Sequence, residues 1–198
     1  MEKRVRMPGR RDQVLDAAVK VLGTAGLRGL TYQAVDKAAV VPAGTTSNHF
    51  RSRDLLVTGV VAHLEALDAR DWKRFGAIPV DGGPEALAGA LARTVQHVLG
   101  PARHRTTARY ALALEGIVRP AVREPLSRAR ESLIELTSKW LADLGSPAPR
   151  EHCRILFDYL DGLMFNQIVM PDAEFDPEPG IRTVLGAFLP PAAPDRPS

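Results

Sequence analysis

Glycine and proline residues divide the chain into segments in which apolar residues recur every three or four positions. Such spacing collects the apolar side chains on one face of an α-helix, and no alternating run of β-branched residues is long enough for a convincing strand. The sequence therefore predicts an all-α protein of about nine helices. The expected helices cover residues 10–23, 31–38, 42–50, 52–75, 84–99, 103–118, 120–144, 149–170 and 178–189.

Local residue preferences support several of these boundaries. Thr31 and Ser52 are suitable N-cap residues. Pro42 suits a first helical turn, because its missing N–H would have no helical partner there. Residues 76–84 are rich in Gly and Pro and predict a connection, whereas the Pro-rich tail, residues 191–198, is expected to be disordered.

The composition, 45% hydrophobic and 25% charged, is that of a soluble globular protein. The chain has one cysteine, Cys153, which excludes an intrachain disulfide and fits a reducing compartment. Its first residues are charged with no apolar stretch behind them, and no run approaches the ~20 apolar residues that span a bilayer. We expect a cytoplasmic protein with no membrane partner.

Charge is distributed unevenly along the chain. Residues 1–56 contain ten Lys and Arg against five Asp and Glu, whereas residues 57–198 contain 16 against 18. The net charge of +3 is therefore the sum of a basic first quarter and a mildly acidic remainder. This asymmetry indicates a polyanionic partner for the N-terminal end alone.

Residues 31–50 combine two short helices with a tight turn at 39–41, the arrangement of a helix-turn-helix. The second short helix is small and polar: Gly44 permits close approach to a duplex, and Thr45, Ser47 and Asn48 can bind phosphates or base edges. Basic residues flank it on both sides along the chain. Each feature alone favours a solvated surface loop, but their ordered combination favours DNA binding.

The stretch 10–56 resembles the DNA-binding domain of the tetracycline-repressor (TetR) family of bacterial transcription regulators. The positions that carry the resemblance are Gly26, Leu30, Thr31, Ala38, Gly44, His49, Phe50, Arg53, Leu55 and Leu56. The resemblance implies a homodimer that binds a palindromic double-stranded operator through residues 1–56. It also implies that a small molecule entering a helical domain, residues 57–190, releases the DNA.

The same resemblance assigns roles to individual residues. Thr31 would hold a phosphate, and His49 and Arg53 would touch the DNA backbone; a cap or brace on the fourth helix is an equally good reading of His49. The residues facing the major groove would be Ala43, Gly44, Thr45, Ser47 and Asn48.

Three residues depart from the family pattern. Val40 stands where the turn usually has glycine. A β-branched residue in a left-handed conformation is strained, so the turn either carries this strain or takes a different shape. Ser47 replaces an aromatic residue, and Pro42 replaces a small polar cap. These departures affect the operator sequence more than DNA binding itself.

The last two helices are expected to form a dimer interface. Both carry apolar stripes, and two such helices from each subunit would make a four-helix seam, as the resemblance also implies. Gly162 would permit close helix approach. The residues expected in this interface are Phe157, Leu160, Met164, Ile168, Ile181, Leu185 and Phe188.

Polar residues on apolar faces are the candidates for effector binding: His97, Arg109, Tyr110 and Asn166. Their alternatives are a surface histidine, a snorkelling pair and, for Asn166, a polar residue that fixes the register of the dimer seam. Glu115 also lies on an apolar face. We expect it to form a structural ion pair with Arg119 one turn later, because an unpaired carboxylate there would be unfavourable.

These patterns favour a ligand-responsive transcriptional regulator, most simply a repressor released by a small, largely apolar effector. The alternatives are a cofactor-free helical enzyme and a helical adaptor that binds protein. The sequence contains no Glu-x-x-His pair, zinc motif, Walker loop or nucleophile elbow, so neither a metal nor a cofactor is expected. Cys153 beside His152 is a poor nucleophile pair, because consecutive helical residues point about 100° apart.

Overall fold

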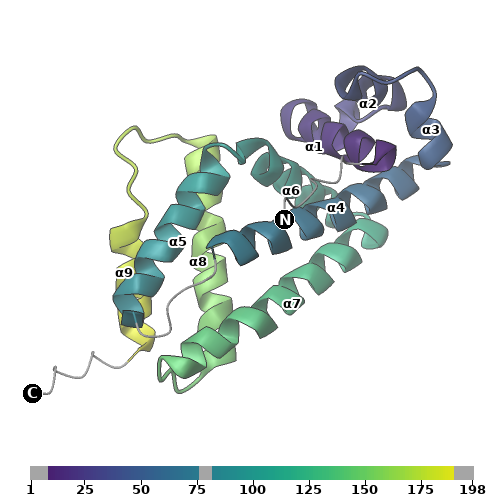
Figure 1. Ribbon diagram of the computed structural model, residues 1–198. Coiled ribbons are helices and arrows are strands. Elements are labelled where there is room, and N and C mark those ends of the chain that lie inside the picture. Colours follow the sequence, from purple (N-terminus) through teal and green to yellow (C-terminus); the bar gives the residue numbers. More distant parts are fainter. Residues whose placement is uncertain (1–8, 76–81, 190–198) are drawn as a thin grey trace, which may run out of the picture. The chain divides into compact units, whose positions relative to one another are not determined.

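The computed structural model describes residues 9–75 and 82–189, except for the side chains of residues 72–75, and this part of the chain contains nine α-helices and no strand. The prediction of an all-α protein is thus confirmed (Figure 1). The helices are α1 (Arg10–Gly29), α2 (Tyr32–Ala39), α3 (Thr45–His49), α4 (Arg53–Phe75), α5 (Gly83–Leu99), α6 (Arg103–Gly116), α7 (Pro120–Asp143), α8 (Pro149–Val169) and α9 (Glu178–Phe188).

The helices pack into two compact units. The first contains the described residues up to Ala69 together with Arg103–Ser127, and the second contains the described residues of Arg70–Ala102 and of the chain from Arg128 on. Helices α4 and α7 contribute to both. The two compact units therefore differ from the two functional domains expected to meet near residue 56. The reason is that α6, from the expected second domain, packs along α1 of the first.

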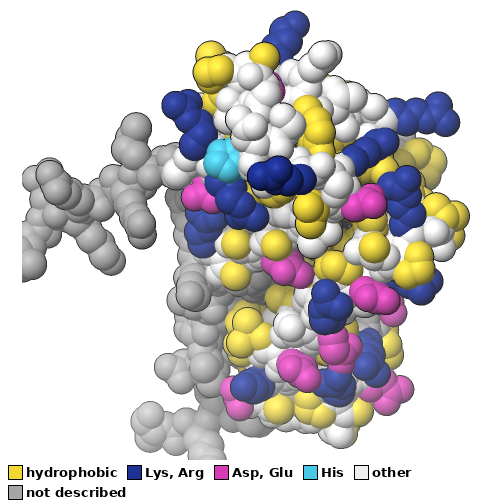
Figure 2. Space-filling view, turned by 90° about the vertical axis from the view of Figure 1, so that its right-hand side faces the viewer, with side chains coloured by type: hydrophobic (Ala, Val, Ile, Leu, Met, Phe, Trp, Pro, Cys, Tyr) yellow, Lys and Arg dark blue, Asp and Glu magenta, His cyan; other side chains and the backbone are white. Residues whose placement is uncertain are grey.

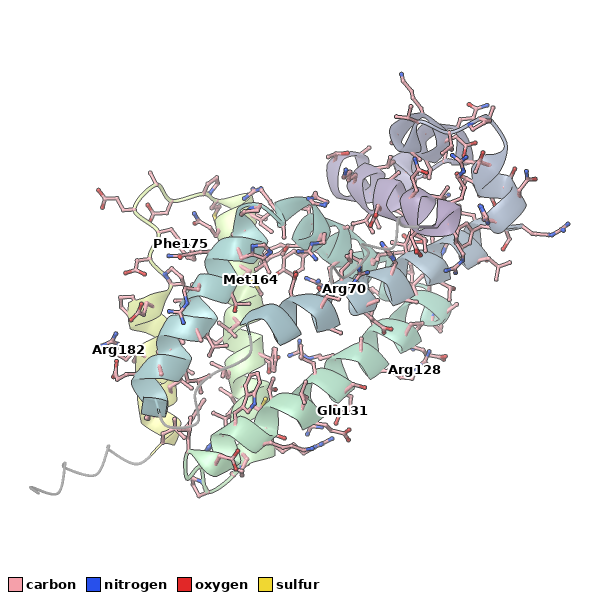
Figure 3. All side chains as sticks on the ribbon, viewed as in Figure 1. Arg70, Arg128, Glu131, Met164, Phe175 and Arg182 are labelled. Carbon is pink, nitrogen blue, oxygen red and sulfur yellow. The ribbon has the colours of Figure 1, made fainter. Side chains whose placement is uncertain are left out.

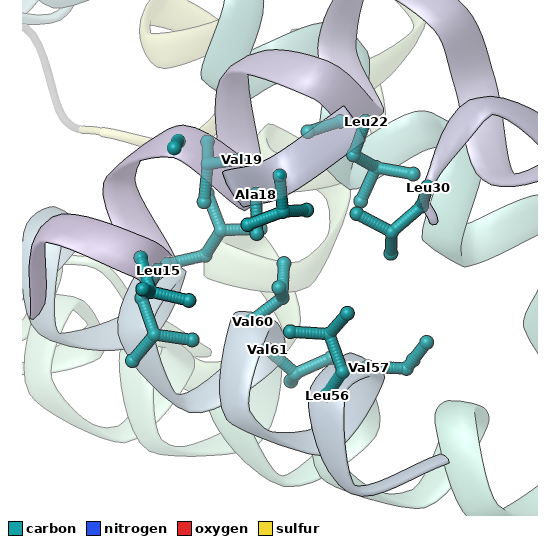
Figure 4. Packing of buried hydrophobic residues seen from close by; sticks show 14 of the residues in the cluster. Leu15, Ala18, Val19, Leu22, Leu30, Leu56, Val57, Val60 and Val61 are labelled. Carbon is teal, nitrogen blue, oxygen red and sulfur yellow. The ribbon is translucent and has the colours of Figure 1, made fainter. Parts of the chain in front are cut away.

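The core of the first unit forms around α1. Its apolar stripe includes Val14, Ala18 and Leu22, each with no exposed surface. The facing residues of α4, shown in Figure 4, are Leu56, Val57, Val60 and Val61. Ala108 and Leu112 of α6 and Val122 of α7 belong to the same core. The apolar faces of α1, α4, α6 and α7 are therefore buried in one cluster.

Helix α1 extends beyond its predicted end at residue 23. Gly23 is helical and lies against α6, where a Cβ would stand 2.0 Å from the carbonyl oxygen of His104. The helical path breaks instead at Gly26, whose φ of 64° is left-handed. The prediction was wrong because Gly23 serves close helix packing rather than chain termination.

Helix α3 is shorter than the predicted 42–50. Gly44, with φ 87°, precedes the first helical residue, and Pro42 lies in the turn, where its carbonyl accepts a hydrogen bond from Thr45 N at 3.1 Å. A left-handed residue cannot continue an α-helix, so Pro42 stands outside the helix. The remaining predicted boundaries agree with the structure to within two residues.

In the second unit α5, α8 and α9 lie side by side (Figure 1). Ile181 and Leu185 of α9 are 0% and 1% exposed in its core. Helix α7 is joined to α8 by ion pairs of Glu131, labelled in Figure 3, with Arg150 and Arg154. The predicted disordered tail lies outside the described residues, and no described helix is long and apolar enough to cross a membrane.

Candidate functional site

The turn between α2 and α3 is built on a left-handed valine. Val40 has φ 53° and ψ 51° and ends α2, while Val41 N donates to the carbonyl of Asp36 at 3.1 Å. Of the two alternatives left open for this turn, the structure has the first: the backbone keeps the conformation that glycine favours, and Val40 carries the strain. Its side chain is 87% exposed, so packing contributes little to holding it there.

A buried carboxylate ties α2 to the start of α3. Asp36 is 5% exposed, and its Oδ2 accepts a hydrogen bond from Gly44 N at 2.8 Å. Its Oδ1 accepts from both Thr46 N, at 2.8 Å, and Thr46 Oγ1, at 2.5 Å. Every donor comes from the first residues of α3 or its cap, so Asp36 ties the start of this helix to α2.

The electrostatics of this contact favour the ionised form of Asp36. Burial by itself raises the pKa of the carboxyl, but the hydrogen bonds from Thr46 Oγ1, Thr46 N and Gly44 N together hold the pKa below its usual value of 3.8. The carboxylate is thus charged at neutral pH. Sequence reasoning missed Asp36, because an acidic residue in a polar helix is ordinarily solvated.

The residues expected to bind DNA lie around α3, and they differ in how free their side chains are. Ala43, Asn48 and His49 are exposed. The hydroxyls of the half-buried Thr45 and Ser47 donate to the carbonyls of Pro42, at 2.6 Å, and Gly44, at 3.0 Å. Asn48 and His49 make no side-chain hydrogen bond to any described residue. The polar groups available to a ligand are therefore concentrated at these two positions.

Two further expected residues have a structural role. Thr31 caps α2 as predicted, its hydroxyl accepting from Ala34 N at 3.2 Å. Arg53 donates to the carbonyl of Leu27, which ties the start of α4 to the end of α1. Both residues are exposed, so their outer surfaces stay accessible to an anion.

The surface around α2 and α3 is basic. Figure 2 looks onto this side of the first unit and shows Lys and Arg side chains gathered around small and polar groups. Arg51, Arg53 and Lys37 are exposed here, and the guanidinium of Arg11 lies 5.2 Å from the ring centre of Phe50. Phosphate oxygens of a duplex are the natural partners of such a rim.

A small apolar cavity lies in the second unit between α5, α7 and α8. Its volume is about 20 Å³, which is room for about one water molecule. Its lining includes the hydroxyl of Thr137 and the thiol of Cys153, and Thr137 Oγ1 lies 3.0 Å from Cys153 Sγ. Burial raises the pKa of the Cys153 thiol, so this cysteine is not a ready nucleophile. The lining residues are Leu87, Leu91, Thr137, Trp140, Leu141, Cys153, Leu156, Phe157 and Leu160.

The four expected effector residues do not line this cavity. The guanidinium of Arg109 contacts both carboxylate oxygens of Asp68 at 2.7 Å, and His97 Nε2 lies 3.7 Å from Asp71. Tyr110 is half-buried and Asn166 is exposed. The expected ion pair of Glu115 with Arg119 is confirmed, at 2.8 Å.

The expected dimer residues divide into buried and accessible ones. Leu160, Ile181 and Leu185 are at most 6% exposed within their own subunit. Leu160 of α8 and the apolar stripe of α9, which packs against α5, belong to the core of the second unit. Their place in a dimer interface stays a prediction. Of the others, Phe157, Met164, Ile168 and Phe188 are half-buried, and Phe188 stacks on His152 with ring centres 4.5 Å apart.

The accessible face of α8 combines two apolar residues that were not predicted for the interface, Ile155 and Val169, with Gly162, where close helix approach was expected. Ile155 is 45% exposed and Val169 is 56% exposed, and Gly162 has open space around its Cα. These three positions are seven residues apart and therefore share one side of the helix. The sequence shows this spacing, but a helix that is apolar on several sides does not reveal which side its own subunit covers.

Comparisons with known proteins agree with this architecture. Residues 82–191 match the model of the family described as Tetracyclin repressor-like, C-terminal domain. No curated protein sequence is similar enough to be matched to the chain. Among solved structures, a member of the TetR family from Streptomyces coelicolor A3 is 31% identical, with a TM-score of 0.70, over 92% of this chain and 99% of that chain.

Two further structures are similar. The multidrug binding protein EbrR complexed with ethidium is 29% identical, with a TM-score of 0.69, over 92% of this chain and 99% of EbrR. A TetR-family regulator from Agrobacterium tumefaciens shares the fold at 17% identity, with a TM-score of 0.74 over 91% of this chain and 98% of that one. The family consists of DNA-binding regulators and not of enzymes. With the family model matching more than half of its residues, the chain belongs to the TetR family of transcriptional regulators.

Proposed function

We propose that this regulator is a homodimeric repressor that binds a palindromic operator and is released by a small, largely apolar effector. The observation that carries the proposal is the presentation of Asn48 and His49, exposed at the end of α3 and followed along the chain by the exposed Arg51 and Arg53. One five-residue helix spans only a few base pairs. Two copies related by a two-fold axis would read two half-sites and give useful specificity.

The roles proposed for individual residues follow from their surroundings. Asn48 is the best candidate for a base contact, because its amide can donate and accept at one base edge and has no described partner. Thr45 and Ser47 are already engaged in local hydrogen bonds, so they would contact DNA with their remaining lone pairs. His49, Thr31 and Arg53 would bind phosphates, and Ala43 and Gly44 would permit close approach.

The outer face of α8 is the proposed dimer surface. Ile155, Gly162 and Val169 form its centre line, and the exposed Phe165 and Asn166 flank it. An exposed apolar face on a helix of 21 residues is unfavourable in water. Pairing this face with the same face of a second subunit would remove both from solvent. It would also place two DNA-binding regions on one dimer.

The cavity of the second unit is the proposed binding site of the effector. Its lining is apolar and includes the aromatic rings of Trp140 and Phe157, which suits a flat hydrophobic molecule. EbrR, the similar multidrug binding protein, binds ethidium. At about 20 Å³ the cavity is too small for such a molecule, so binding requires the surrounding helices to move.

Operator binding is tested by titrating the protein with the DNA upstream of its own gene at several salt concentrations. We expect specific binding whose log affinity falls linearly with log salt, since phosphate contacts release counterions. Asn48→Ala should lower affinity for the operator more than for random DNA, and Arg51→Ala should lower both alike. Absence of binding at every salt concentration would falsify the proposal.

Effector release is tested separately, with a panel of neutral and cationic aromatic compounds. A compound that raises the thermal midpoint of the free protein and weakens operator binding supports the proposed mechanism. Leu156→Trp, which fills the cavity, should abolish this response while operator binding stays intact. If no compound changes either quantity, the protein is a constitutive DNA binder.

A further inference from the structure

We propose that Asp36 is a positioning residue for DNA reading, which sets the rotation of α3 through its hydrogen bonds to Gly44 and Thr46. The inference rests on the proposed role of α3 as the helix that reads the operator. Asp36 itself is buried and would not touch DNA. It would act through the orientation that it imposes on Asn48.

The geometry fixes α3 in two directions. One oxygen of the carboxylate accepts from the cap residue Gly44 at 2.8 Å, and the other accepts from the backbone and side chain of Thr46 at 2.8 and 2.5 Å. Thr46 has no exposed surface. Because hydrogen bonds are directional, contacts at two positions of the chain, Gly44 and Thr46, restrict both translation and rotation of the helix.

Helix α3 needs such an external restraint. It has five residues, and its N-cap Gly44 offers no side-chain hydrogen bond. An isolated helix of this length is not stable, because nucleation is unfavourable and few hydrogen bonds follow it. Successive residues point about 100° apart, so a modest rotation would turn Asn48 away from a base edge.

A carboxylate serves this purpose better than an apolar pair. Two apolar side chains at positions 36 and 46 could bury similar surface, but they would tolerate several rotations of α3. A buried, fully hydrogen-bonded anion has one favourable arrangement, because any other leaves its charge unsatisfied. We therefore expect Asp36 to contribute to specificity beyond its contribution to stability.

The experiment compares four variants in the full-length protein. Asp36→Ala removes the acceptor, Thr46→Val removes one donor with little change in shape, and Thr46→Ser keeps both donors. Gln13→Ala is the matched control: Gln13 Nε2 donates to the carbonyl of Ala39 at 2.9 Å, and so this hydrogen bond joins α1 to the end of α2 and not to α3. Each variant is measured for thermal midpoint and for affinity to operator and random DNA.

The expected result separates positioning from stability. Asp36→Ala and Thr46→Val should lower the ratio of operator affinity to random-DNA affinity about ten-fold or more, the size of one lost base contact. Thr46→Ser should keep the wild-type ratio. Gln13→Ala should lower the thermal midpoint and leave the ratio unchanged. Affinity for random DNA should stay near that of the wild type in all variants that fold.

Three outcomes overturn the inference, two in DNA binding and one in amide exchange. Either Thr46→Val keeps the wild-type ratio, or Gln13→Ala lowers it as much as Thr46→Val does at an equal loss of thermal midpoint. Amide hydrogen exchange of Gly44 and Thr46 supplies a readout without DNA. Unprotected amides in the wild type would also refute the positioning of α3 by Asp36. A wild-type protein that does not discriminate operator from random DNA contradicts the proposed function instead, even where both amides are protected.

Discussion

Gly23 of α1 lies so close to His104 of α6 that a Cβ at position 23 would stand 2.0 Å from the carbonyl oxygen of His104. The neighbour is backbone and cannot rotate away. The contact therefore sets how closely α1 can approach α6, and α1 carries the largest share of the core of the first unit.

Gly23→Ala is accordingly expected to destabilise the protein by about 2 kcal/mol or more, because an added methyl group must push two helices apart. Chemical denaturation gives the free energy of unfolding. Gly186→Ala is the control: that helical glycine has no atom within 4 Å of a Cβ, so alanine should stabilise α9 by about 0.5–1 kcal/mol. Equal effects of the two substitutions would contradict the close contact.

Val40→Gly is expected to stabilise the protein slightly. Removing the left-handed strain of a non-glycine residue gains about 1–2 kcal/mol, and the larger unfolded-state entropy of glycine returns about 0.5–1 kcal/mol of it. The side chain is 87% exposed, so little packing is lost. The check is the midpoint of urea unfolding, with Val41→Gly as a control that should destabilise. A lower midpoint for Val40→Gly would show that the valine is not strained.

The contribution of Asp36 to stability should depend on pH. Its folded pKa lies below the ordinary value of 3.8. The carboxylate therefore stabilises the fold fully above that value, and this stabilisation is lost as pH falls through the folded pKa. Asp36→Asn should thus be clearly destabilised at pH 7, and its difference from the wild type should shrink in acid. The measurement is the free energy of unfolding of both proteins across the acidic range; a difference that grows on acidification would give the opposite sign.

These residues show how far the sequence alone leads. The spacing of apolar residues predicts the helices, and Thr31 is recognisable as a cap because capping is a local interaction. The role of Asp36 is not recognisable, since its partners lie eight and ten residues further along and become donors only when the turn has folded. The same limit applies to Gly23, which reads as a helix end until α6 is placed beside it.

The sequence does not show what an apolar stripe packs against either. Ile181 and Leu185 have the spacing of an interface, yet they pack inside their own subunit against α5. The periodicity of apolar residues shows that one face of a helix must be buried. It does not show whether the same subunit or a partner covers that face. Helix α8 is apolar on more than one side, and only its folded surroundings distinguish the buried side with Leu156 and Leu160 from the open side with Ile155 and Val169.

The open side of α8 is expected to hold the dimer together. Gly162→Arg should dissociate the proposed dimer while leaving each subunit folded, because the space around Gly162 is open within its own subunit. Two arginines facing one another across a two-fold axis would bury unpaired charge, at a cost of about 3 kcal/mol or more, which raises the dimer dissociation constant more than a hundred-fold. Sedimentation measures the association state and circular dichroism the helix content. Leu136→Arg, on an exposed position of α7, is the matched control and should remain dimeric. Because a palindromic operator is bound by two DNA-binding regions, Gly162→Arg should also lose operator affinity at low protein concentration. A Gly162→Arg variant that stays dimeric would place the interface on another face of the chain.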